Sequence, residues 1–92
     1  MRAESVLDRA WDIAPQVSVR PEPFGALLYH FGTRQLSLVK DRSLLAAIEG
    51  LSDASSARAA CTAVGIDEVL LPRYARALAR LVATDVLRER PR

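Results

Sequence analysis

The side chains best suited to nucleophilic or acid–base chemistry are few and widely spaced. His30 is the only histidine and Cys61 the only cysteine in the 92-residue chain. A catalytic triad needs a base beside its nucleophile, and His30 could serve Cys61 or a serine. His30, however, lies in an apolar segment between Tyr29 and Phe31, which is typical of a structural or surface histidine. We therefore do not expect His30 to be catalytic.

The remaining candidates also favour structural roles. One histidine and one cysteine give no zinc-binding spacing, and no P-loop or dinucleotide-binding glycine pattern occurs. Cys61 shares a predicted helix face with Ala60 and Val64, so we interpret it as a small core residue and not as a reactive thiol. Asp67 and Glu68 precede a predicted helix, where capping and dipole compensation explain them best. We expect neither an enzyme nor a cofactor site.

The last predicted helix carries two features with two interpretations each. Three arginines share its polar face within about 60° of arc: Arg73, Arg76 and Arg80. They form either a solvated face or a contact for carboxylates on a partner, which guanidinium groups bind well. Three residues flank its core stripe: Tyr74, Ala77 and Leu81. They either pack in the core or form a groove wall in which Ala77 leaves room for a partner side chain.

The first half of the chain predicts three short strands. Residues 16–20 and 35–40 alternate polar and apolar side chains, and residues 25–31 are rich in strand-favouring aromatics. Proline cannot donate to a ladder, so Pro21 and Pro23 should end the first strand. The third strand is a candidate sheet edge that could pair with an added strand. Within it, Leu36 and Leu38 share one face, which we expect to lie in the core.

The second half predicts three helices. The first begins at Asp41 or Ser43 and ends near Gly50, the second begins at Ser55 or Ser56 and stops at Gly65, and Pro72 suits the first turn of the third. We predict one domain over residues 1–92, with a loosely structured arm at residues 1–14 anchored by Trp11 and a frayed tail at residues 88–92. The predicted fold is α+β, a three-stranded antiparallel sheet followed by three α-helices.

Charge, cysteine content and hydropathy limit the classes of function that the sequence supports. The formal net charge of +2 is weak evidence for nucleic acid, because DNA-binding proteins usually concentrate positive charge. One cysteine allows no internal disulfide. The sequence has no signal-peptide pattern and no apolar run long enough to span a bilayer. We therefore expect a cytoplasmic protein.

Three segments carry a resemblance to a known family. They are WDIAP at residues 11–15, VRPEPFGALLY at residues 19–29 and LSLVK at residues 36–40. The chain resembles the mycofactocin-system peptide chaperones, which are PqqD-like recognition elements for ribosomally synthesised, post-translationally modified peptides. The resemblance covers about residues 10–87, and residues 20–26 are its most specific part. It implies a winged-helix-like domain.

The resemblance also implies the partners. A ribosomal precursor peptide would add as a strand beside the third strand, in a cleft walled by the third helix, and a radical S-adenosylmethionine maturase would be the second partner. That enzyme would hold the iron–sulfur clusters, for which this chain lacks cysteines. The predicted peptide-binding residues are Gln35, Leu36, Ser37, Leu38, Val39, Lys40, Arg73, Tyr74, Ala77, Arg80 and Leu81.

Two other functions fit parts of the pattern. A winged-helix DNA-binding protein would share the fold, and the arginines of the third helix could enter a groove of DNA. The low net charge argues against it, as does the absence of an obvious wing after the third helix. A small interaction subunit without a peptide groove is the other possibility. Exposed strand edges also permit a homodimer.

Overall fold

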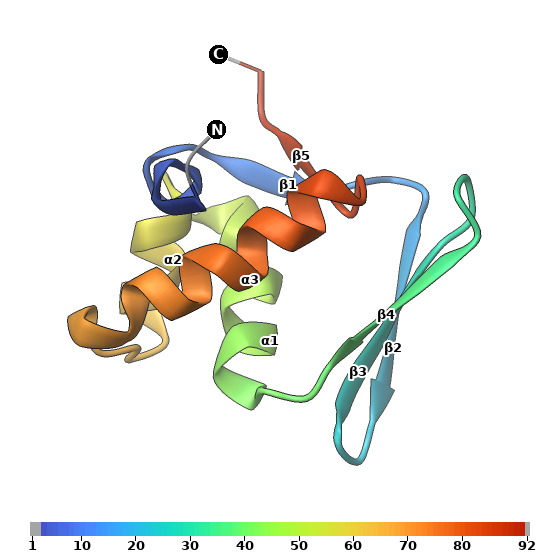
Figure 1. The fold of residues 1–92 in the computed structure, drawn as a ribbon, viewed down its shortest axis with the longest axis horizontal. Helices are drawn as coiled ribbons and strands as arrows, with labels where there is room; N and C mark the ends of the chain where they lie inside the picture. Colours follow the sequence, from blue (N-terminus) through green and yellow to red (C-terminus); the bar gives the residue numbers. More distant parts are fainter. Residues whose placement is uncertain (1–2, 92) are drawn as a thin grey trace.

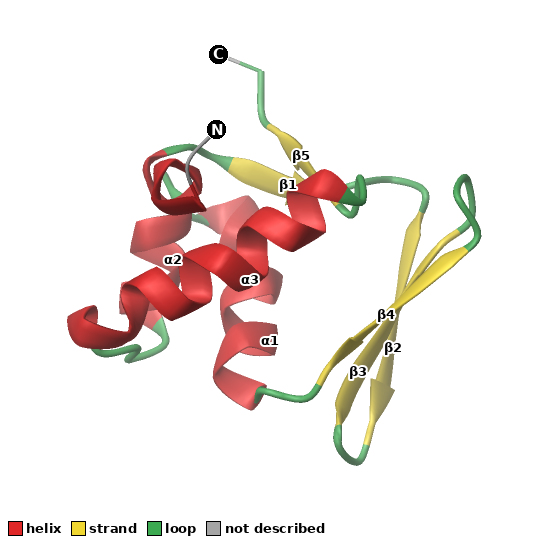
Figure 2. Cartoon of the chain, in the orientation of Figure 1, coloured by secondary structure: helices red, strands yellow, loops and turns green. Residues whose placement is uncertain are grey.

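The computed structural model describes residues 3–91 and confirms the α+β order of a three-stranded antiparallel sheet followed by three helices (Figure 1). The strands are β2 (Val17–Glu22), β3 (Gly25–His30) and β4 (Gln35–Val39). The helices are α1 (Arg42–Gly50), α2 (Ala57–Ala63) and α3 (Leu71–Ala83). The sheet stands to one side of the helices, and β4 leads directly into α1 (Figure 2).

The first strand of this sheet is longer than predicted. The expectation that Pro21 would end it is wrong, since β2 continues to Glu22 and Pro21 lies opposite Ala26 of β3. The strand order is β2-β3-β4, so β2 is an edge, where a missing amide need not break the ladder. The turn into β3 ends at Gly25, with φ of 147°. A side chain at Gly25 would collide with the backbone carbonyl of Val39 in β4, so glycine is needed there.

The alternation of β4 was predicted correctly, but the side of the strand that faces the core was predicted wrongly. Leu36 and Leu38 are 57% and 55% exposed, whereas Val39 is buried. The register explains this, because residues directly opposite each other share a face. Val39 pairs with buried Ala26, while Leu36 and Leu38 pair with residues of β3 on the face turned away from the core. The sheet therefore has an apolar outer face as well as an apolar inner one.

The helices begin and end where the sequence places their caps. Oδ1 of Asp41 accepts a hydrogen bond from the Leu44 amide at 3.0 Å, and Oγ of Ser56 accepts one from the Ala59 amide at 3.1 Å. These bonds satisfy amides that have no partner inside the first helical turn. Gly65, with φ of 84°, follows α2 in the left-handed conformation.

The predicted arm at residues 1–14 is ordered wherever the structure describes it. Ala3–Asp8 form a 3-10 helix whose Val6 and Leu7 are buried. Trp11 is also buried, and its Nε1 donates a 2.8 Å hydrogen bond to the carbonyl of Val6. Packing of these apolar side chains against α2 and α3 fixes the segment. Met1 and Arg2 lie outside the described residues.

The C-terminal residues that we predicted to be a frayed tail are also ordered wherever the structure describes them. Strand β5 (Leu87–Glu89) pairs antiparallel with β1 (Trp11–Ile13), forming a second, two-stranded sheet. The Arg90 guanidinium follows and donates to the Asp12 carboxylate at 3.1 Å and to the Leu51 carbonyl at 2.8 Å. A guanidinium carries enough donors to hold several acceptors at once. Only Arg92 of the tail lies outside the described residues.

The main core lies where α1, α2, α3 and the N-terminal 3-10 helix meet, with one face of the sheet closing one side. Its largest fully buried side chains are Leu28, Ile48, Leu51, Leu78, Leu87, Val6 and Cys61. Within residues 3–91, no helix has the length and apolar character needed to cross a membrane.

Candidate functional site

A groove lies between the edge strand β4 and the helices α1 and α3. Its volume is about 350 Å³, at the small end of the range for ligand sites, which suits one or two side chains better than a compact cofactor. We call its lining the groove residues: Ser37, Leu38, Val39, Leu44, Ala77, Arg80, Leu81 and Thr84. Ala77, Arg80 and Leu81 of α3 and the residue that caps its C-terminus, Thr84, recur at intervals of three and four positions, so they form one stripe along the helix.

The strand beside this groove has an unused pairing edge. Within residues 3–91, β4 is hydrogen-bonded to β3 alone, and its other side has no strand partner. The opposite edge of the sheet, β2, contains Pro21, which cannot donate to an added strand. β4 contains no proline. Of the two edges, β4 is therefore the better template for strand addition.

Six of the predicted site residues line the groove, and five do not. Those in the lining are Ser37, Leu38, Val39, Ala77, Arg80 and Leu81. Those outside it are Gln35, Leu36, Lys40, Arg73 and Tyr74. Leu44 and Thr84 were missed. Thr84 continues the spacing of Ala77 and Leu81 and could have been found from it.

Of the two interpretations given for Tyr74, the structure matches core packing, because Tyr74 does not line the groove. Its ring is buried, and its hydroxyl donates a 2.8 Å hydrogen bond to Oδ2 of Asp41. Asp41 follows β4 by two positions and caps α1. Tyr74 therefore joins α3 to the link between β4 and α1, and it supports the groove from behind instead of lining it.

The electrostatics of this pair follow from their contacts. Burial alone would raise the pKa of the Asp41 carboxyl, but the hydrogen bonds from Tyr74 and from the amides of Leu44 and Ser43, with the charge of Arg73, lower the pKa overall. The bond to Asp41, together with burial, raises the pKa of the Tyr74 hydroxyl. The pair is thus held as a carboxylate and a neutral phenol.

His30 has a structural position on the inner face of the sheet. It is 4% exposed, and its Nδ1 accepts hydrogen bonds from the amides of Gly32 at 3.0 Å and Thr33 at 3.1 Å. Because Nδ1 is the acceptor, the proton of the neutral ring belongs on Nε2, which is buried without a partner among the described residues. The side chain holds the turn between β3 and β4.

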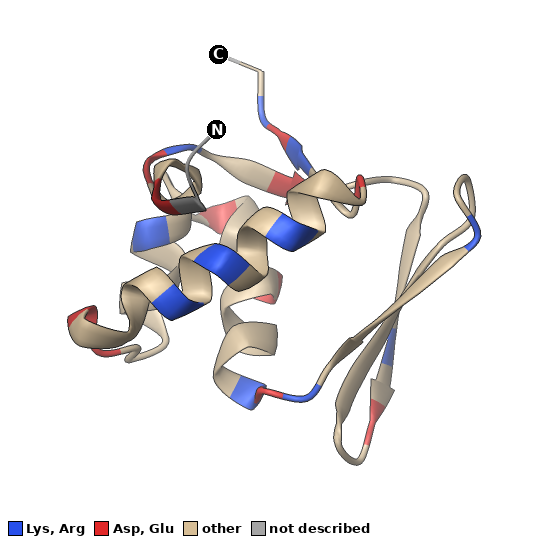
Figure 3. Ribbon diagram, in the orientation of Figure 1, with Lys and Arg blue, Asp and Glu red and all other residues tan. Residues whose placement is uncertain are grey.

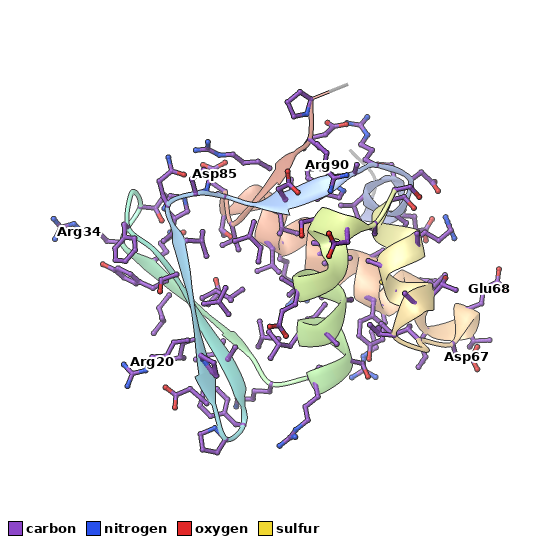
Figure 4. All side chains as sticks on the ribbon, turned by 180° about the vertical axis from the view of Figure 1, so that it is seen from behind. Arg20, Arg34, Asp67, Glu68, Asp85 and Arg90 are labelled. Atoms are coloured by element: carbon purple, nitrogen blue, oxygen red, sulfur yellow. The ribbon has the colours of Figure 1, made fainter. Side chains whose placement is uncertain are left out.

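The other candidates for chemistry lie away from the groove. Cys61 is buried in α2, and burial raises the pKa of its thiol, the opposite of what a reactive thiolate needs. Oδ1 of Asp67 accepts from the Val69 amide at 3.0 Å, which is a capping contact. Asp67 and Glu68 lie at the end of the molecule opposite the sheet (Figure 4). Among residues 3–91, no group of three or more potential metal ligands occurs.

Comparisons with known proteins add independent information. Residues 10–88 match the model of the "Peptide chaperone MftB family". The chain is 50% identical over 80 residues to proteins named peptide chaperone MftB from Mycobacterium tuberculosis and Mycobacterium ulcerans, covering 87% of this chain and 73% of each relative. It is 46% identical to the protein of that name from Mycolicibacterium smegmatis, of which it covers 78%. No solved structure matches the chain.

Proposed function

Because the chain belongs to the peptide chaperone MftB family, we propose that it binds a ribosomal precursor peptide as an added strand on β4 and presents it to a radical S-adenosylmethionine maturase. The observation that carries the proposal is the groove beside β4, whose outer edge pairs with no other strand in the described part of the chain. Main-chain hydrogen bonds along β4 supply affinity, and the groove selects alternate side chains of the peptide. The winged-helix likeness implied by the family stays a prediction.

The same arrangement suits temporary holding. A peptide that becomes ordered only on docking loses conformational freedom, and this cost lowers its net affinity. Weak binding allows the peptide to leave after it has been modified. A peptide paired along β4 would continue beyond the strand at both ends, so its residues before and after the docked segment would be available to a second protein.

In this proposal the chain itself is not catalytic. The groove residues include no histidine, cysteine or carboxylate, so a bound peptide would meet no general base or nucleophilic thiol there. His30 and Cys61 are both buried and have structural roles. Radical chemistry would belong entirely to the maturase.

DNA binding remains the second candidate, because one observation favours it. Arg73, Arg76 and Arg80 are exposed along α3, and basic positions recur along that helix in Figure 3. A helix with such a row can lie against phosphates. The net charge of +2 over the whole chain makes this function weaker than peptide binding.

Titration of the protein against a synthetic precursor peptide and against duplex DNA, each over a salt series, separates the two functions. We expect saturable peptide binding with a shallow salt dependence. Binding to DNA alone, with an affinity that falls steeply as salt rises, would instead assign the arginines to phosphate contacts. Failure of the peptide to bind at any salt concentration would overturn the proposal.

A further inference from the structure

Arg80 is the only charged side chain among the groove residues. It is exposed, and its guanidinium forms no ion pair within residues 3–91. Several other arginines do have acidic partners in the fold, for example Arg90 with Asp12 at 3.1 Å and Arg58 with Asp8 at 3.1 Å. The groove therefore presents one positive charge that forms no ion pair with any acidic group of residues 3–91.

The neighbouring arginines of α3 differ from Arg80. Arg73 is close enough to Asp41 for its charge to lower the pKa of that carboxyl, so it already has an acidic neighbour, and it lies outside the groove lining. Arg76 is exposed and also lies outside the lining. Of the three, only Arg80 combines access to the groove with a free guanidinium.

Apolar surface surrounds this charge. Leu38 of β4 and Leu44 of α1 approach the groove from one side, and Ala77 and Leu81 lie one helical turn or less from Arg80 on the other. Partial exclusion of water by such side chains strengthens a charge-assisted hydrogen bond relative to one on an open surface. A carboxylate is the peptide group that a guanidinium can bind in two-point geometry.

We propose that the docked peptide carries an aspartate or glutamate that pairs with Arg80, beside an apolar side chain packed on Ala77 and Leu81. This inference rests on the proposed function and specifies the class of peptide recognised. In a strand added to β4, residues two positions apart lie on the same face, roughly 7 Å apart. The expected motif is therefore one apolar and one acidic residue separated by a single residue.

The test is a titration of the full chain with the synthetic precursor peptide at low salt. The variants are Arg80→Gln and the matched control Arg76→Gln, on the same helix but outside the groove. The peptide is used as encoded and with each Asp or Glu changed singly to Asn or Gln. We expect Arg80→Gln to weaken binding about fivefold, the scale of an exposed ion pair, and Arg76→Gln to leave affinity unchanged.

A second arm identifies the partner residue. One peptide carboxylate should show the same loss when neutralised, with no additional loss when it is combined with Arg80→Gln. Arg80→Glu should bind a peptide bearing lysine at that position better than it binds the natural one. Equal affinities for Arg80→Gln and the parent, or losses that add for every carboxylate, would overturn this inference while leaving strand addition intact. Absence of saturable binding by the parent would instead overturn the proposed function.

Discussion

The hydroxyl of Tyr74 reaches from α3 to Oδ2 of Asp41 over 2.8 Å, while Oδ1 of the same carboxylate caps α1. One carboxylate thus joins the beginning of α1 to α3, two positions after the end of β4. The elements on both sides of the groove are connected through it. The separation between β4 and α3 is therefore set partly by a hydrogen bond between two residues outside the groove lining.

Removal of that hydrogen bond should lower both the free energy of unfolding and the affinity for the peptide. We expect Tyr74→Phe to lower the free energy of unfolding by about 1–2 kcal/mol, because a hydrogen bond to a charged acceptor is lost and the packing is kept. Peptide affinity should fall as the wall becomes less fixed. Urea denaturation and calorimetry measure the two effects. Tyr29→Phe, on the outer sheet face, is the control and should change neither; equal effects in both variants would contradict the role of Asp41.

The same pair predicts how stability depends on pH. The pKa of Asp41 is lowered from 3.8 in the folded state, so its contribution is present above that value and is lost as pH falls through the folded pKa. The pKa of Tyr74 is raised from 10.0, so its contribution is present below that value and is lost as pH rises through the folded pKa. The stability difference between the parent and Asp41→Asn should therefore shrink in acid. A difference that is constant from pH 2 to pH 6 would count against it.

Amide exchange should locate the bound peptide. We expect the precursor peptide to slow exchange in β4, where new main-chain hydrogen bonds form, and along Ala77 and Leu81 of α3. Strand β2, at the other edge of the sheet, is the internal control and should exchange at its original rate. Protection confined to β2, or saturable binding without protection of β4, would place the peptide elsewhere.

Ala77 tests the wall of the groove. Ala77→Leu should weaken peptide binding by about 1–3 kcal/mol, the scale of overpacking a fitted contact, with a smaller change in the free energy of unfolding because leucine is a good helix former. Ala79→Leu, a partly buried position of the same helix outside the groove, is the matched control. Unchanged peptide affinity in Ala77→Leu would show that the peptide binds elsewhere. A large loss of unfolding free energy would show that Ala77 serves core packing instead.

His30 should matter for stability and not for turnover. His30→Ala leaves the amides of Gly32 and Thr33 without their acceptor, so we expect a loss of about 1–3 kcal/mol in unfolding free energy. His30→Asn restores an acceptor oxygen and should lose less.

Cys61→Ala should likewise leave maturation by the partner enzyme intact wherever the protein folds. Loss of maturation with normal folding and normal peptide affinity would reveal chemistry in this chain.

Local chemistry made much of this fold predictable. Caps such as Asp41 and Ser56 act within one helical turn, so residue type and spacing locate them from sequence alone. The face of β4 was harder, because a period of two identifies alternation and leaves its direction to the register with β3. Leu36 and Leu38 were misplaced for that reason. Six groove residues were predicted because periodicity identifies the edge strand and the α3 stripe and the family resemblance implies that the two form one cleft. The contact of Tyr74 depends on a distant carboxylate that no local pattern reveals.

The pairing of β1 with β5 has a consequence for biosynthesis. Asp12 leaves the ribosome 78 positions before Arg90, the residue that holds it. Until β5 has been made, β1 lacks the only strand with which it pairs among residues 3–91. Contacts so distant along the chain form late and slow the final step of folding. A nascent chain stalled before residue 87 would therefore leave the pairing edge of β1 exposed, and the addition of β5 completes this second sheet.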